Sequence, residues 1–254
     1  MCRIISIANQ KGGVGKTTTA VNLSACLAIA EKKTLLIDMD PQGNATSGLG
    51  LQNKQLQYTI HDLLFEQIDP LSVICSTEID QLFLVPANMD LIGAEISLAD
   101  RKGRETLLKT AMAVYEKKFD FIIMDTPPSL GLLTLNSLTA SKSVLIPLQC
   151  EYYSLEGLSQ IMNAFNFTRK SYNPFLTVEG ILLTMYNART NLSIQVENDV
   201  RSHFREKVFK TIIPRNVRLS ESPSFGKPII LYDVNSKGSQ AYLSLTSEIL
   251  KNGS

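Results

Sequence analysis

The chain has 254 residues, of which 44% are apolar and 19% are charged, and this composition supports a large buried core. No apolar run reaches the roughly 18 residues that a membrane-spanning helix requires, and the start, MCRIISIANQ, has the pattern of a strand and not of a signal peptide. The four cysteines are scattered without CxxC pairs, which disfavours a zinc site, an iron–sulfur centre and a disulfide framework. We therefore expect a cytoplasmic protein with reduced thiols.

The net charge is +1, but the charges are unevenly distributed. Residues 1–159 carry 13 Lys or Arg and 17 Asp or Glu, whereas residues 160–254 carry 12 and 7. The basic C-terminal part suits contact with a polyanion, although an ordinary solvated surface could have the same composition.

Apolar, β-rich runs alternate with helix-like stretches along most of the chain. The expected strands cover residues 3–9, 34–37, 82–86, 119–124, 143–148, 177–185 and 208–214. Near-continuous apolar strands fit a sheet that is covered on both faces, and their alternation with helices predicts parallel pairing. We expect one α/β domain over residues 1–254, with a doubly wound, mostly parallel sheet. Two later helices are expected over residues 154–171 and around the apolar repeat of residues 192–204.

The first expected strand runs directly into a glycine- and lysine-rich loop that opens a helix. Glycines let backbone N–H groups turn towards phosphate oxygens, and the helix N-terminus adds partial positive charge. Lys16 is expected to meet the β- and γ-phosphates of a nucleotide, and the Thr17 hydroxyl to bind Mg²⁺. The predicted nucleotide-binding residues of this loop are Lys11, Gly12, Gly13, Val14, Gly15, Lys16, Thr17 and Thr18.

Carboxylates follow two of the apolar strands. Asp38 and Asp40 come at the end of the second expected strand, and Asp125 follows the run Phe121–Met124. The carboxyl edge of a doubly wound sheet is where ligands bind, and Asp125 has the position of a Walker B aspartate beside a metal. Helix or turn capping is the alternative for each acid alone, and for Asp38 both interpretations stay open.

The loop departs from the common pattern GxxxxGK[ST], because Gln10 replaces the first glycine and Lys11 is an additional lysine. KGGVGKT resembles the deviant Walker A motif of the family that contains ParA, MinD, the nitrogenase iron protein and the arsenite-pump ATPase. In that family the first lysine, here Lys11, reaches phosphates bound by the partner subunit. The resemblance therefore implies an ATP-dependent homodimer.

Four further segments, DMDPQGNATSGLG, DTPPS, PLQCEYYSLEGL and PRNVRLSESPSFGKPIILYD, resemble Soj-type ParA proteins in particular. The resemblance spans about residues 4–245 and implies a P-loop ATPase that hydrolyses ATP with Mg²⁺. Because the first strand begins near the N-terminus, we expect the short form, without the DNA-binding extension of larger plasmid ParA proteins. The implied catalytic residues are Lys11, Lys16 and Asp40, and the implied magnesium-binding residues are Thr17, Asp40 and Asp125.

The same resemblance assigns adenine recognition and DNA binding to residues of the C-terminal part. It implies adenine recognition by Asn187, Pro214, Arg215 and Asn216, and binding of non-specific DNA by Arg189 and Arg218. Guanidinium groups bind backbone phosphates without reading sequence, while local ion pairs are the alternative role for surface arginines. The implied function is a nucleoid-associated partitioning ATPase, slow by itself and stimulated by a ParB-like centromere-binding protein.

Three other functions compete with this interpretation. A MinD-like membrane-associated ATPase needs a C-terminal amphipathic helix with a basic face, but residues 238–254 contain Lys251 as their one basic residue. A redox iron protein is disfavoured because Cys150 lies within a ParA-like segment. A scaffold that binds ATP without hydrolysing it is disfavoured by Asp40 and Asp125.

Overall fold

The computed structural model describes residues 2–52, 56–66, 68–93, 97–98, 100–151 and 154–252. Its centre is a seven-stranded sheet in the order β3-β4-β2-β5-β1-β6-β7. The strands are β1 (Arg3–Ile7), β2 (Thr34–Asp38), β3 (Cys75–Ser76), β4 (Leu82–Val85), β5 (Phe121–Asp125), β6 (Ser143–Gln149) and β7 (Thr177–Thr184). All neighbouring pairs are parallel except β3 and β4, so the expected doubly wound, mostly parallel sheet is confirmed.

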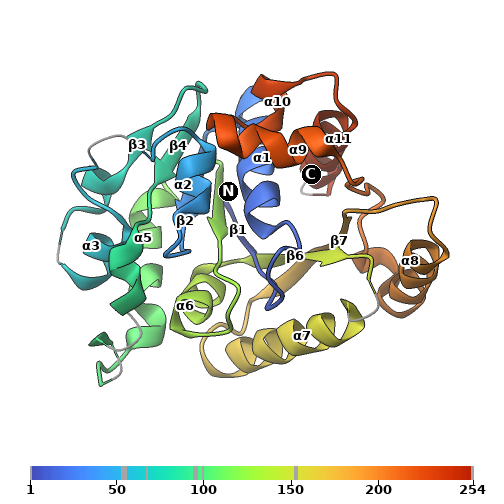
Figure 1. The fold of residues 1–254 in the computed structure, drawn as a ribbon. Coiled ribbons are helices and arrows are strands. Elements are labelled where there is room, and N and C mark those ends of the chain that lie inside the picture. The colour runs from blue at the N-terminus through green and yellow to red at the C-terminus, as the bar shows by residue number, and fades with distance from the viewer. Residues whose placement is uncertain are drawn as a thin grey trace.

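Helices cover both faces of the sheet (Figure 1), because successive side chains of each strand point to opposite faces. One face carries α1 (Lys16–Ile29) and α11 (Lys237–Lys251), and the other carries α5 (Leu107–Tyr115), α6 (Leu132–Ala140) and α7 (Ser154–Ser171). The remaining helices are α2 (Asn44–Gly48), α3 (Ile60–Phe65), α8 (Asn191–Phe204), α9 (Val217–Glu221) and α10 (Ile229–Tyr232). Short 3-10 helices are η1 (Pro70–Val73), η2 (Met89–Gly93), η3 (Arg104–Thr106), η4 (Arg205–Lys207) and η5 (Ser222–Phe225). None of the described helices is both long and apolar enough to cross a membrane.

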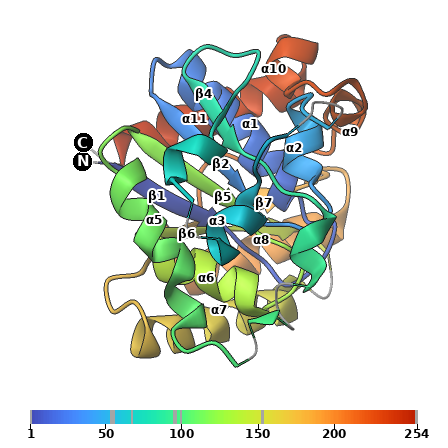
Figure 2. The same cartoon turned by 90° about the vertical axis from the view of Figure 1, so that its left-hand side faces the viewer.

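The last helix, α11, packs against the first helix, α1. Tyr242 and Leu245 of α11 are buried in the same apolar cluster as α1, and the hydroxyls of Tyr242 and Thr19 lie 3.2 Å apart. The Arg3 guanidinium donates to the backbone oxygen of Ile249 at 2.6 Å, so the two ends of the chain lie side by side (Figure 2). The helix that follows the glycine-rich loop is therefore covered by the C-terminal end of the chain.

The prediction of a strand over residues 208–214 is wrong. At the start of this segment Val208 forms an isolated bridge with β7, and at its end Pro214 forms one with Tyr186, which follows β7. Between these bridges, the backbone N–H groups of Lys210 and Thr211 donate to the carboxylate of Glu248 on α11, at 2.7 and 2.9 Å. Because a side chain takes these donors, a continuous ladder with β7 does not form.

The expected helix over residues 154–171 is confirmed as α7, with the same bounds. The second expected helix is α8, which buries Val196 and Val200 but leaves Leu192 41% exposed. The apolar repeat therefore faces the core through only part of its length. The two-residue strand β3 is antiparallel and was not expected, because two residues are too short for a periodic pattern.

Candidate nucleotide-binding site

The loop between β1 and α1 has the backbone that a phosphate cradle needs. Gly13 and Gly15 have φ values of 73° and 87°, in the left-handed region that glycine adopts without strain. No side chain caps the N-terminus of α1, and no acid lies in its first turn. The first N–H groups of this 14-residue helix are thus left for an anion. The Thr184 hydroxyl donates to the Val14 carbonyl at 2.9 Å and ties the loop to the end of β7.

Lys16 is buried at the start of α1, and its ammonium group donates to the Lys11 carbonyl at 3.1 Å. Burial lowers the pKa of Lys16, while Asp125 and Asp40 oppose that shift. The lysine therefore lies between its own loop and two carboxylates, as a cation that binds terminal phosphates would.

Asp125 ends β5 and is fully buried. Neither of its oxygens has a hydrogen-bond partner among the described residues. Burial and then the neighbouring Asp38 raise the pKa of Asp125 well above its usual value, while Thr17 and Lys16 lower it. A carboxylate held in this state beside a threonine hydroxyl is compatible with a hydrated Mg²⁺, and the magnesium-binding role of Asp125 stays a prediction.

The described residues contain no cluster of three or more His, Cys, Asp or Glu side chains in metal-binding geometry. Magnesium needs no such cluster, because it keeps several waters and usually takes one or two carboxylates together with substrate phosphates. Thr17, Asp40 and Asp125 therefore remain the predicted protein ligands of that kind.

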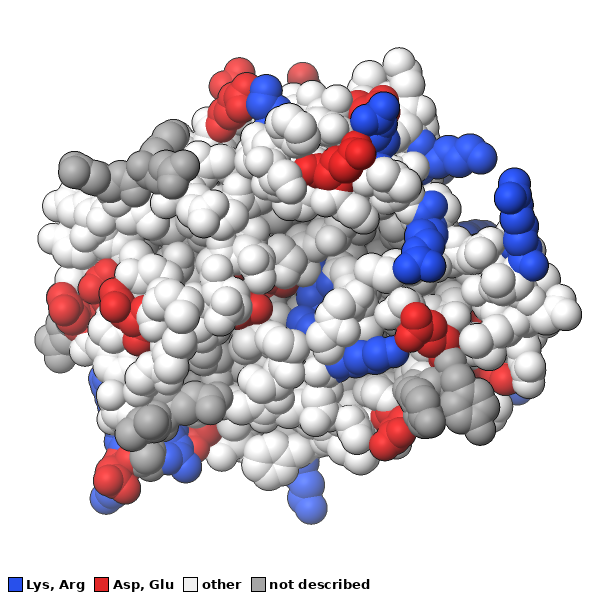
Figure 3. Space-filling model, viewed as in Figure 1, with Lys and Arg blue, Asp and Glu red and all other residues white. Residues whose placement is uncertain are grey.

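A cleft of about 630 Å³ opens over the loop. Figure 3 shows this face of the molecule hollowed near its centre, where basic and acidic side chains meet. Asp40 lines the cleft, whereas Asp38 and Asp125 are fully buried and do not. The lining comes from the loop and the start of α1 (Gly12, Gly13, Gly15, Lys16, Thr17, Thr18, Val21, Asn22), from Asp40, from the α2 region (Asn44, Ser47, Gly48, Gln52), and from Pro128, Met185, Ser222, Pro223, Ser224 and Lys227.

Sequence reasoning assigned no nucleotide contact to Met185, to the η5 residues of this lining or to Lys227. Met185 follows β7 and has a φ of 49°, an uncommon conformation for a residue with a side chain. Backbone strain of this kind clusters at functional sites, but the sequence carries no signal for it.

The structure brings the four predicted adenine-binding residues together, beside the cleft and not in its lining. Tyr186 bridges to Pro214, and the Arg215 N–H donates to the Tyr186 carbonyl at 3.0 Å. The side-chain oxygens of Asn187 and Asn216 each accept a local backbone N–H at 3.1 Å. Among the described residues, neither amide NH₂ group has an acceptor, which is compatible with donation to a base edge. The adenine assignment itself stays a prediction.

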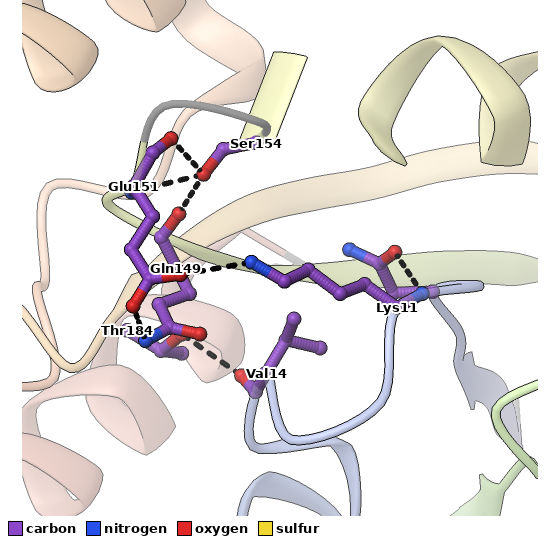
Figure 4. Close-up of polar contacts among 7 residues, drawn as sticks. Lys11, Val14, Gln149, Glu151, Ser154 and Thr184 are labelled. Atoms are coloured by element: carbon purple, nitrogen blue, oxygen red, sulfur yellow. Dashed lines mark hydrogen bonds and ion pairs between the residues drawn. The ribbon is translucent and has the colours of Figure 1, made fainter. Parts of the chain in front are cut away.

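Lys11 lies at the surface and points across the loop to the segment after β6 (Figure 4). Its ammonium group is 2.9 Å from a carboxylate oxygen of Glu151, and the Gln149 amide donates to the other oxygen at 2.5 Å. In this state the lysine is therefore paired within its own chain. Tyr152 and Tyr153, which belong to the same ParA-like segment, lie outside the described residues.

The two predicted DNA-binding arginines differ in their surroundings. Arg189 is exposed, and no described residue forms an ion pair with its guanidinium. Arg218 is paired with Glu221 at 3.0 Å and with Asp233 at 3.6 Å. Basic side chains gather on the side of the molecule where β7, α8 and α9 lie (Figure 3).

Comparison with known proteins gives consistent matches over the whole chain. A family model described as an AAA domain matches residues 2–178. The sporulation initiation inhibitor protein Soj of Bacillus subtilis is 55% identical over 253 residues, covering 100% of both chains. The chromosome partitioning protein ParA of Myxococcus xanthus is 55% identical over 249 residues, covering 98% of this chain and 88% of the relative.

Solved structures of similar proteins agree with the fold. Cobyrinic acid a,c-diamide synthase of Mycobacterium smegmatis with bound ADP and magnesium has a TM-score of 0.87 and 38% identity, covering 100% of this chain and 96% of the other. The cell division ATPase MinD of Pyrococcus furiosus has a TM-score of 0.82 and 28% identity, covering 99% and 100%.

Replacing Asp125 by asparagine should stabilise the nucleotide-free protein and weaken magnesium-dependent nucleotide binding. The raised pKa means that the folded chain holds this proton more tightly than the unfolded chain does, so the ionised carboxylate destabilises the fold at neutral pH. The gain should be about 1–3 kcal/mol at pH 7 and should shrink as the pH falls towards the usual range of an aspartate. Thermal unfolding at several pH values measures this.

Asp80→Asn serves as the control, because Asp80 is exposed. The assignment of Asp125 would be wrong if its variant bound nucleotide with the same magnesium dependence and unfolded at the wild-type temperature throughout the pH range.

Proposed function

This chain belongs to the ParA/Soj family of partitioning ATPases, and we propose that it is an ATP-dependent switch that binds DNA without sequence preference. ATP and Mg²⁺ are the ligands proposed for the cleft. The observation that carries this proposal is the buried Asp125 carboxylate, with both oxygens unpartnered among the described residues, beside the Lys16 ammonium group. A carboxyl group buried in this way is unfavourable as the anion unless a cation pairs with it, and a magnesium–nucleotide complex supplies such a cation.

The residues of the cleft have separate roles in this proposal. The N–H groups of the loop and the Lys16 ammonium group hold the β- and γ-phosphates, and Asp40 orients the attacking water. Thr17 and Asp125 hold Mg²⁺, which when bound neutralises charge on the phosphate oxygens. Asp40 suits its role because it lines the cleft, within reach of a bound nucleotide, and its own carboxylate accepts the Gln42 N–H at 3.0 Å.

The proposed dimer requires the Lys11 ammonium group to break its ion pair with Glu151 of the same chain. The resemblance gives this lysine a role at the partner's phosphates, whereas here it pairs with Glu151. The two side chains are 35% and 51% exposed, and exposed ion pairs contribute only about 0–1 kcal/mol. A bound nucleotide of high negative charge can therefore displace Glu151, and the lysine becomes a contact that forms only when ATP is present.

DNA binding is proposed for the basic surface that contains Arg189 and Arg218. Arg189 has a guanidinium without an ion-pair partner among the described residues, so it can bind a DNA phosphate at little cost. Arg218 must first break its ion pairs with Glu221 and Asp233 before it can bind a DNA phosphate. A dimer carries two copies of this surface, so ATP should raise both DNA affinity and its dependence on salt.

Hydrolysis is proposed to be slow until a partner protein stimulates it. The described lining of the cleft contains lysines but no arginine. An arginine at the transition state is worth about 10³–10⁵ in rate, so its absence leaves room for stimulation. A ParB-like centromere-binding protein is the proposed partner, and the nucleoid is the proposed location.

The alternative, a MinD-like membrane-associated ATPase, is disfavoured by the packing of α11. Tyr242, Leu245 and Ile249 form the apolar face of this helix and are buried against the rest of the chain. That face cannot insert into a bilayer while α11 is docked.

Glu151→Gln should favour the ATP-bound dimer. Removing the charge frees Lys11 in each monomer, and two such ion pairs are broken for every dimer that forms. Dimerisation with a non-hydrolysable ATP analogue should therefore need up to about thirtyfold less protein, as expected for up to about 1 kcal/mol per pair. Sedimentation velocity measures the change, with Glu156→Gln, an exposed glutamate of α7, as the control. Unchanged or weaker dimerisation would show that the ion pair does not restrain Lys11.

The proposed function is tested by binding to a random-sequence DNA duplex with ATP, with ADP and without nucleotide, across a salt series. We expect tight, salt-sensitive binding with ATP alone. Arg189→Glu should weaken it at least tenfold and reduce the log–log salt slope by about 0.9 for each DNA phosphate that is no longer neutralised, and Arg218→Glu should do so less.

Arg169→Glu makes the same charge change on exposed α7, across the sheet from α1, and should leave DNA binding near wild type. Equal DNA binding with and without ATP would contradict the proposal. So would ATP-dependent binding to anionic liposomes without affinity for DNA, which would favour the MinD-like function.

A further inference from the structure

Two carboxylates at the same level of the sheet have opposite environments. Asp38 and Asp125 are register partners in β2 and β5, and both are fully buried. Asp125 has no hydrogen-bond partner among the described residues, whereas both oxygens of Asp38 are occupied. One Asp38 oxygen accepts the Thr46 N–H and the Thr46 hydroxyl, each at 2.8 Å, and the other accepts the Asp40 N–H at 3.1 Å. Both oxygens of Asp38 are therefore taken up by hydrogen bonds within the chain.

The Thr46 hydroxyl joins three parts of the fold. It donates to Asp38 at the end of β2 and accepts the Ala87 N–H, which follows β4, at 3.1 Å. Thr46 belongs to α2, is 3% exposed and does not line the cleft. A single buried hydroxyl thus fixes α2 to the ends of two neighbouring strands.

The loop that carries Asp40 is held from both sides by these contacts. At its start, the Asp40 N–H is bound by Asp38. At its end, the Gly43 N–H donates to the Asp40 carbonyl at 2.9 Å, and a side chain on Gly43 would lie 3.1 Å from the Ala87 carbonyl. Loop, helix α2 and the end of β4 are consequently packed backbone against backbone, with little freedom to move separately.

We propose that Asp38 and Thr46 are positioning residues for ATP hydrolysis: without touching the nucleotide, they fix the direction in which Asp40 enters the cleft. The proposal rests on the proposed function, in which Asp40 orients the attacking water. Asp40 must stay within hydrogen-bond reach of that water, and a misplacement of its carboxylate by about 1 Å can lower the rate about 10²-fold. In the proposed function, nucleotide affinity comes mainly from Lys16 and the loop, whereas the side-chain hydrogen bonds of Thr46 go to Asp38 and Ala87.

The test compares Thr46→Val, which removes the hydroxyl at nearly constant volume, with Thr46→Ser, which retains it. Thr46→Val should lower kcat for ATP hydrolysis about tenfold or more, while the Kd of a fluorescent ATP analogue stays within about twofold of wild type. Thr46→Ser should restore kcat to within about threefold. Thr168→Val removes another buried hydroxyl, bonded within α7, and should leave kcat near wild type. Thermal unfolding of each variant monitors the fold.

Wild-type kcat in Thr46→Val would overturn the inference. So would a parallel loss of kcat and ATP-analogue affinity, because a merely structural role disturbs both. If Thr46→Val does not fold, Thr46→Ala removes the same hydroxyl without adding volume, and the same two outcomes apply. The proposed role of Asp40 is tested separately by Asp40→Ala: normal hydrolysis there would refute the proposed function whatever Thr46 does.

Discussion

The site depends on one constraint, the burial of two carboxylates side by side at the ends of β2 and β5. A buried carboxylate costs several kcal/mol unless it is paired or fully hydrogen-bonded. The chain satisfies Asp38 with α2, whereas Asp125 lies near Lys16 without a hydrogen-bond partner among the described residues. The ionised Asp125 is therefore electrostatically unfavourable for the fold, and a ligand that binds the folded state alone would add to its stability.

Local sequence patterns were enough to predict the parts of the site that a short stretch of chain builds. The glycine-rich loop follows its strand directly, and Asp125 follows four apolar residues, so both could be placed at the ligand edge of the sheet. The near-continuous apolar runs also predicted the fold class, because the strands of a parallel sheet are covered on both faces.

Contacts between residues that are far apart in the chain could not be predicted from the sequence. Residues 208–214 have a strand-like composition, but Glu248, on a helix near the end of the chain, takes their backbone donors. Likewise, the two open interpretations of Asp38 could be separated only by Thr46 and its link to Ala87. The pairing of Lys11 with Glu151 joins residues 140 positions apart, and no periodicity predicts it.

The packing of α11 on α1 has a consequence for the synthesis of the protein. The glycine-rich loop and α1 are translated about 200 residues before Tyr242 and the other residues of α11 that cover α1. Chains are made at about 5–20 residues per second, so the apolar side of α1 stays uncovered for about 10–40 s. A nascent chain of this protein therefore cannot bury the apolar side of α1 before α11 has been made, and a stalled or truncated product that lacks α11 exposes a hydrophobic helix to chaperones and proteases.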